Sequence, residues 1–139
     1  MGAIGLPSLE LSGLEDLFTE EEVRSVVLDL LNDKAPGLDG FTGLFYKKAW
    51  DWDIIKVDIM NAFNAFWSQD ARSLSHLNDA YMILLKKKSQ PTEIRDYRPI
   101  SLIHSISKLI TKCLANRLAT KLDALVNRNQ RPFIKGRYI

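Results

Sequence analysis

The spacing of apolar residues predicts a first helix that begins near Thr19. Thr19 and the three glutamates after it form a capping box, in which the threonine oxygen accepts a backbone amide and Glu22 reaches back to the cap. Five apolar residues then recur at helical spacing and fall on one stripe: Val23, Val26, Val27, Leu30 and Leu31. Turn-forming residues between 32 and 37 should end this helix.

A second helical pattern covers residues 42–67 and is rich in aromatic side chains, which we interpret as core rather than as a platform for stacked bases. The dipeptide Trp-Asp occurs twice in succession at residues 50–53. Because each helical residue turns by about 100°, two extra residues rotate everything after them by about 200°. If the repeat is an insertion, the helix must break or bulge there, so that the apolar faces on both sides still point inward.

The remaining pattern predicts a hairpin followed by a long helix. Residues 78–88 and 97–103 read as strands joined by a turn-rich segment, and Pro99 makes the second an edge or bulged strand because proline has no amide hydrogen. Residues 105–126 should form the longest amphipathic helix of the chain. The predicted fold is therefore α+β and mostly helical, with amphipathic helices around a short antiparallel β-hairpin. Residues 1–17 lack periodicity, so we expect a frayed or disordered leader.

Composition suits one domain, and charge divides the chain. The sequence has 139 residues and a net charge of +2. Residues 1–70 hold 5 Lys/Arg and 13 Asp/Glu, whereas residues 71–139 hold 14 and 4. The basic half favours an anionic partner, with nucleic acid or nucleotide as the leading candidates, although the two halves could also neutralise each other within one fold. We expect an intracellular protein that is neither secreted nor membrane-bound, because the chain lacks an apolar run of roughly 20 residues and a basic signal region.

Candidate catalytic and metal-binding groups are sparse. The single Cys113 excludes an internal disulfide framework and a four-cysteine zinc site, and it lies on an apolar stripe where it reads as a small buried hydrophobe. His76 and His104 read as a loop residue and a strand-end residue rather than catalysts. The chain has no Asp-Asp pair. We therefore assign no catalytic residue and no metal ligand.

The hairpin offers the clearest candidate site. It would bring Lys86, Lys87 and Lys88 close to Arg95 and Arg98, a cluster that suits a phosphate group. Lysines at a hairpin tip also protect a sheet edge from pairing with other strands, and the residues alone do not decide between these interpretations. The Pro- and Gly-containing loop of residues 34–40 could bring backbone amides near an anion or could simply connect two helices.

Five strings in order and spacing resemble one family: DKAPGLDGF at residues 33–41, FYKK at 45–48, DYRPISL at 96–102, KCLANRL at 112–118 and QRPFIKGR at 130–137. Together they resemble the reverse transcriptase domain of non-LTR (LINE-type) retrotransposons, most closely the plant elements. The resemblance covers residues 18–139, which would be the fingers and the start of the palm.

The resemblance implies that the hairpin is the fingers tip, where Lys87 and Arg98 match the positions that grip the triphosphate of the incoming nucleotide. It also implies an RNA template, a DNA primer, a deoxynucleoside triphosphate and the catalytic core of a palm, which this chain lacks. The family's Mg²⁺ is held by aspartates beyond the last string, so we expect no cofactor and no polymerase activity in this chain alone. Possible template or primer contacts are Lys34, Gly37, Lys86, Lys88, Arg95, Gln130, Lys135, Gly136 and Arg137.

Three departures from the family pattern stand out. Leu38 replaces a usual proline, Leu85-Lys86-Lys87 replaces Ile-Pro-Lys, and the Trp-Asp repeat adds two residues. The predicted function is a fragment of an RNA-directed DNA polymerase. The alternatives are a module that binds RNA or an RNA–DNA hybrid without sequence preference, and a non-functional remnant. Under each of these interpretations we expect the protein in the nucleus or the cytoplasm.

Overall fold

Helix α1 (Glu20–Leu28) begins where the sequence predicts and ends one turn earlier. The computed structural model describes residues 12–32, 34–69, 76–77 and 79–126. Thr19 Oγ1 accepts the Glu22 amide at 3.2 Å, which satisfies one of the free donors at the helix start. The backbone amide of Asp29 donates to the Ser25 and Val27 carbonyls and ends the helix. Leu30 therefore lies beyond the helix and is only partly buried against the core, and Leu31 is exposed. The reciprocal contact predicted for Glu22 is wrong, because its carboxylate binds Arg117 instead.

The Trp-Asp repeat breaks the second helical region as predicted. Helix α2 (Gly43–Ala49) stops before Trp50, and α3 (Asp53–Trp67) starts after Trp52. The break buries Trp50 but leaves Trp52 61% exposed. The expectation that both apolar faces point inward is confirmed for Phe63, which is fully buried, and is wrong for Ile54, which is 78% exposed.

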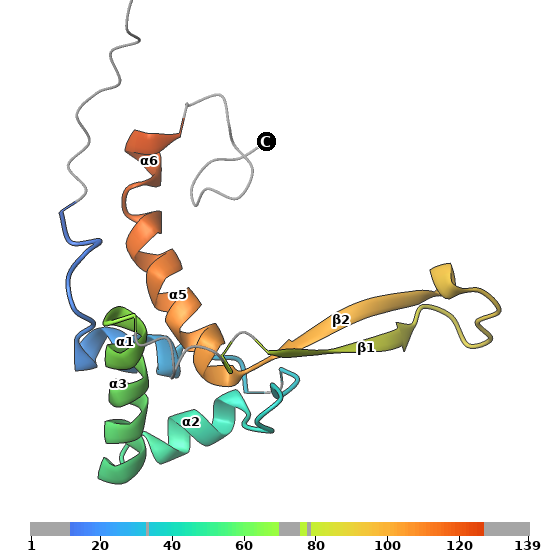
Figure 1. Ribbon diagram of the computed structural model, residues 1–139, viewed down its shortest axis with the longest axis horizontal. Helices are drawn as coiled ribbons and strands as arrows, with labels where there is room; N and C mark the ends of the chain where they lie inside the picture. The colour runs from blue at the N-terminus through green and yellow to red at the C-terminus, as the bar shows by residue number, and fades with distance from the viewer. Residues whose placement is uncertain (1–11, 33, 70–75, 78, 127–139) are drawn as a thin grey trace, which may run out of the picture.

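Strands β1 (Ala80–Lys86) and β2 (Tyr97–Ile103) form the predicted antiparallel hairpin, with a short 3₁₀ helix η1 (Ile94–Asp96) before β2. Their register is continuous, from Ala80 opposite Ile103 to Lys86 opposite Tyr97, so Pro99 lies on an edge strand without a bulge. The ribbon projects away from the helices (Figure 1), and every β1 residue is exposed.

Helices α1, α3 and α5 (Ser105–Ala119) enclose the core. The largest fully buried side chains are Val23, Val26, Val27, Phe63, Leu109 and Cys113. Cys113 is fully buried among apolar side chains, which confirms its interpretation as a small buried hydrophobe. This burial raises the pKa of its thiol to about 11. The single long helix predicted over residues 105–126 is wrong, because α5 ends at Ala119 and a separate turn, α6 (Leu122–Leu125), follows.

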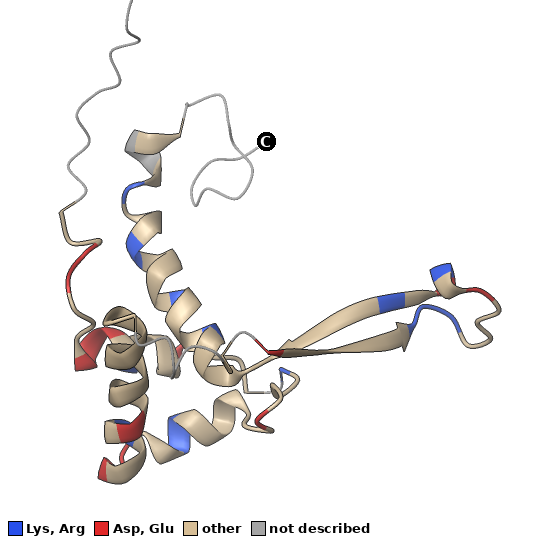
Figure 2. Cartoon of the chain, viewed as in Figure 1, with Lys and Arg blue, Asp and Glu red and all other residues tan. Residues whose placement is uncertain are grey.

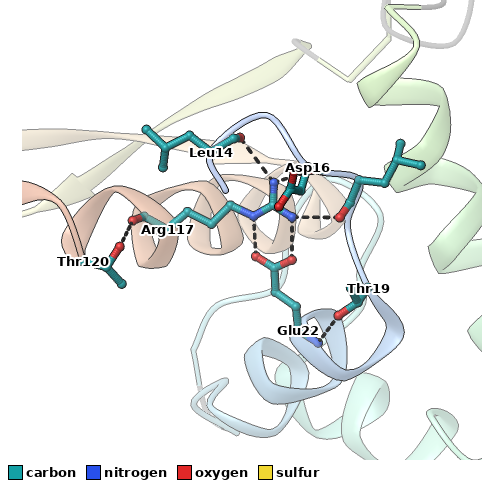
Figure 3. A network of polar contacts seen from close by, with 7 residues as sticks. Leu14, Asp16, Thr19, Glu22, Arg117 and Thr120 are labelled. Atoms are coloured by element: carbon teal, nitrogen blue, oxygen red, sulfur yellow. Dashed lines mark hydrogen bonds and ion pairs between the residues drawn. The ribbon is translucent and has the colours of Figure 1, made fainter. Parts of the chain in front are cut away.

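Arg117 of α5 holds the chain before α1 in place (Figure 3). Its guanidinium forms two parallel hydrogen bonds to the Glu22 carboxylate, each 2.7 Å long. It also donates to the backbone carbonyls of Leu14, Asp16 and Leu17. Part of the predicted leader is therefore anchored to α5, while residues 1–11 lie outside the described residues.

The structure is α+β with a two-stranded antiparallel hairpin, as predicted, and about half of it is helical. Acidic residues mark α1 and α3, and basic residues mark α5 and the far end of the hairpin (Figure 2). The charge division of the sequence therefore runs through the helical body, because the basic helix α5 packs against the acidic helix α1. None of the helices that the structure describes is long and apolar enough to cross a membrane.

Candidate nucleotide and nucleic-acid interface

The hairpin tip, residues 86–98, is shaped by the carboxylate of Asp96. Asp96 Oδ2 accepts the backbone amides of Thr92 and Glu93 at 2.9 and 3.1 Å, which caps η1. Lys88 Nζ lies 2.8 Å from the same oxygen. One side chain therefore fixes both sides of the turn.

Two of the five tip cations are neutralised locally. Lys88 pairs with Asp96, and Arg95 pairs with Glu93. Lys87 donates from Nζ to the Arg95 carbonyl at 2.8 Å, a contact that fixes the ammonium without cancelling its charge. Within the described ranges, Lys86, Lys87 and Arg98 have no ion-pair partner, so the tip carries an excess of positive charge.

The strand register separates these three cations onto two faces. Arg98 lies opposite Leu85, and Lys86 lies opposite Tyr97. The Lys87 amide donates to the Asp96 carbonyl at 2.7 Å and so extends the ladder by one position. Because side chains alternate along a strand, Lys87 shares the face of Arg98, whereas Lys86 belongs to the other. Diagonal neighbours of this kind have Cβ atoms roughly 7 Å apart, within reach of one phosphate chain.

Acid should loosen this tip. The hydrogen bond from Lys88, followed by the Thr92 amide, lowers the pKa of Asp96 below its ordinary 3.8. A lowered pKa means that Asp96 stabilises the tip fully above pH 3.8, and that this stabilisation is lost as pH falls through the lowered value. We expect the amide resonances of Thr92 and Glu93 to move toward random-coil positions over that acidic range. Asp96→Asn should remove the pH dependence, whereas an unchanged titration curve in this variant would contradict the assignment.

The loop of residues 34–41 is held against the start of α5. Asp39 Oδ2 accepts the Ser105 amide at 2.6 Å, and its Oδ1 accepts the Ser105 hydroxyl at 2.9 Å. His104, at the usual capping position before Ser105, makes no side-chain capping bond. Asp39 caps α5 instead, from a loop that is distant in the sequence. His104 directly follows β2, as predicted for a strand-end residue, and its Nδ1 atom lies 3.9 Å from Asp39 Oδ2.

Close packing explains the glycine at position 37. A Cβ atom at Gly37 would lie 2.2 Å from the Ile103 carbonyl oxygen and 3.0 Å from the Ser105 amide nitrogen. Only a residue without a side chain allows this approach. Gly37, predicted as a possible template or primer contact, is buried at this junction and lets the loop approach the backbone of residues 103–105.

Burial of Tyr46 completes this junction. Its pKa is raised to about 12, mainly by burial and then by the nearby Asp39 carboxylate. Tyr46 therefore keeps its proton throughout the neutral range. The loop is thus coupled to the base of the hairpin by a cluster of Asp39, Ser105 and Tyr46. The sequence marked this cluster only through the aspartate within the Gly-Leu-Asp-Gly turn.

Several predicted contacts cannot be placed. Of the possible template or primer contacts, four lie outside the described residues: Gln130, Lys135, Gly136 and Arg137. Lys34 is exposed beside two surface hollows. In the part of the chain that the structure describes, no three His, Cys, Asp or Glu side chains gather as a set of metal ligands.

Comparison with known proteins points to mobile elements. The chain is 29% identical over 126 residues to the "Transposon TX1 uncharacterized 149 kDa protein" of Xenopus laevis, a match over 91% of this chain and 9% of that protein. It is 28% identical over 105 residues to the "RNA-directed DNA polymerase from mobile element jockey" of Drosophila funebris, over 76% of this chain and 11% of that protein. No protein-family profile matches. The chain is therefore similar, along most of its length, to about a tenth of two mobile-element proteins.

Proposed function

We propose that the chain is the fingers and the start of the palm of a reverse transcriptase from a non-LTR retrotransposon. We further propose that its hairpin tip binds the triphosphate of an incoming deoxynucleotide. The observation that carries this proposal is the charge arrangement of the tip. Glu93 and Asp96 engage Arg95 and Lys88, which leaves Lys87 and Arg98 on one face with uncompensated charge. Similarity to an RNA-directed DNA polymerase supports the polymerase context.

The two side chains have complementary roles. The planar guanidinium of Arg98 can bind two phosphate oxygens at once, whereas Lys87 supplies a compact charge. The Lys87 ammonium donates one hydrogen bond to the Arg95 carbonyl, and this contact orients it. Its two other N–H groups remain as donors for a ligand. The tip would therefore bind and orient the triphosphate, while nucleotide transfer belongs to the longer protein.

Arg98→Ala is the sharpest test of this function. We expect it to weaken binding of a fluorescent deoxynucleoside triphosphate at least about tenfold, because a bidentate charged hydrogen bond is lost. Lys86→Ala removes one charge from the opposite face of the same ribbon and should change the affinity less than about threefold. Fluorescence anisotropy of the 139-residue chain measures both.

The same pair of variants separates the main alternative. The affinity of a module that binds RNA nonspecifically through phosphates depends on its total positive charge and not on the face of the ribbon that carries each charge. Arg98→Ala and Lys86→Ala would then lower the affinity equally. Equal losses for Arg98→Ala and Lys86→Ala would therefore contradict the triphosphate site.

A further inference from the structure

Strand β1 has an unpaired edge. The sheet in the described ranges has two strands, so β1 pairs with β2 on one side only, and the ribbon carries both strands away from the helices (Figure 1). Five consecutive apolar residues, 81–85, lie along β1, and every residue of the strand is exposed. Tyr81 and Met82 are 67% and 70% exposed. A long apolar edge of this kind readily pairs with a strand of another chain.

Alternation along the ladder decides which amides point to the free edge. The Lys87 amide donates to the Asp96 carbonyl and so points toward the side of β2. Since successive amides of a strand point to opposite sides, those of the even-numbered β1 residues, including Leu84 and Lys86, point away from β2. Leu84 lies opposite Pro99, so position 99 also points outward, where proline has no amide to donate. The outer edge of β2 is therefore blocked, whereas that of β1 is open.

Lys86 keeps the β1 edge open. The reverse transcriptases that the chain resembles usually have proline where this chain has Lys86. A proline at position 86 would remove one amide from the free edge and leave the ladder to β2 intact, because that amide points away from β2. The open edge is thus a property of this chain's own sequence rather than of the pattern that it resembles.

The two ends of β1 carry opposite charges. Asp79 precedes the strand, and Lys86 and Lys87 mark its other end. Within the described ranges neither lysine has an ion-pair partner, and Asp79 has only His76, whose Nδ1 lies 3.5 Å from Asp79 Oδ2. An antiparallel alignment of two β1 strands brings the acidic end of each to the basic end of the other, whereas a parallel alignment brings like charges together. Charge complementarity therefore favours a second, antiparallel copy of this chain as the partner of the edge.

We propose that two copies of the chain pair through their β1 edges and form a four-stranded antiparallel sheet. Complete overlap of the two strands puts the twofold axis at Ile83, the middle residue of β1. Residues 81–85 of the two copies then form apolar cross-strand pairs, and Asp79 of each copy lies opposite Lys87 of the other. Because the outer edges of both β2 strands are blocked by proline, the assembly ends at the dimer. Dimerisation goes beyond the proposed triphosphate binding, and neither requires the other.

Sedimentation velocity of the 139-residue chain tests the dimer. Between about 1 and about 100 μM, the parent chain should pass reversibly from monomer to dimer. Lys86→Pro should weaken dimerisation at least about tenfold, because each copy loses one edge amide and leaves an acceptor of the other copy unpaired. Lys86→Ala is the matched control. It removes the same charge but keeps the amide, so the dimer should weaken less than about threefold. Circular dichroism verifies that both variants fold.

Hydrogen exchange of the parent chain locates the interface without any substitution. The amides of Leu84 and Lys86 should exchange at least about tenfold more slowly at the highest protein concentration than at the lowest, because the dimer gives them acceptors. The Ser101 amide points outward on β2 and serves as the internal control. Its exchange rate should not depend on protein concentration.

Charge reversal tests the register. Asp79→Lys should weaken the dimer at least about fivefold, and Asp79→Lys/Lys87→Asp should restore it, because the double variant exchanges the two charges of one cross-strand pair. The inference is overturned by a parent chain that stays monomeric up to about 100 μM, by a Lys86→Pro dimer as tight as that of the parent, or by slower exchange at Ser101 rather than at Leu84 and Lys86. None of these outcomes bears on Arg98, which every variant retains.

Discussion

Arg117→Ala is expected to lower the free energy of unfolding by about 3 kcal/mol, one of the two largest effects of any single substitution that we predict. The side chain of Arg117 is 11% exposed and that of Glu22 is 23% exposed, so removing the guanidinium leaves a poorly solvated carboxylate. Three backbone carbonyls before α1 lose their donor at the same time. The Phe18 ring also loses a cation 4.4 Å from its centroid.

Urea unfolding followed by circular dichroism measures this effect. Lys112→Ala is the matched control, since Lys112 lies on the same helix and forms an exposed ion pair with Asp29 at 3.3 Å. The control should cost less than about 1 kcal/mol. Arg117→Lys should recover little, because an ammonium cannot reproduce the bidentate fork. A loss in Arg117→Ala no larger than that of the control would show that the network does not stabilise the fold.

Gly37→Ala is expected to destabilise the protein by about 3 kcal/mol, because it forces a methyl group into the backbone of the strand–helix junction. The nearest atoms, the Ile103 carbonyl oxygen and the Ser105 nitrogen, belong to the main chain and cannot rotate away. The loop must move instead, which would pull Asp39 from the start of α5. The substitution should therefore weaken both the fold and the position of the hairpin base.

Gly40→Ala provides the control in the same loop. Gly40 has a φ of +74°, but a Cβ atom there would meet nothing within 4 Å. Gly40→Ala should lower the free energy of unfolding by only about 1 kcal/mol, because the left-handed backbone conformation is its sole source of strain. Urea unfolding of both variants gives the comparison. Equal destabilisation would mean that backbone conformation, rather than the close approach, explains the glycine at position 37.

Local signals predicted the elements well. Thr19 caps α1, the Trp-Asp repeat ends α2, and the second strand has the predicted bounds, because each of these depends on neighbours within a few residues. The break between α5 and α6 was not predicted, because the apolar stripe continues on both sides of Thr120 and Lys121, with Leu118 before them and Leu122 after them. Periodicity reports which face is apolar but not where a helix loses its packing partner.

Long-range polar contacts could not be predicted from the sequence. Arg117 and Glu22 are 95 residues apart, and Asp39 and Ser105 are 66 apart. Nothing in either local pattern marks these residues as partners. The cationic tip was predictable from the clustering of lysines, but the pairing that leaves Arg98 uncompensated depends on the register and on the turn around Asp96.

Amide resonances of the ¹⁵N-labelled chain, titrated with a deoxynucleoside triphosphate, test the central claim most directly. The triphosphate site predicts the largest shifts at Lys87, Arg98 and the residues between them, with saturation at a single affinity. Those shifts should disappear in Arg98→Ala and persist in Lys86→Ala. Shifts spread evenly over the basic residues of α5 and the hairpin, or no shifts at the tip, would contradict the account.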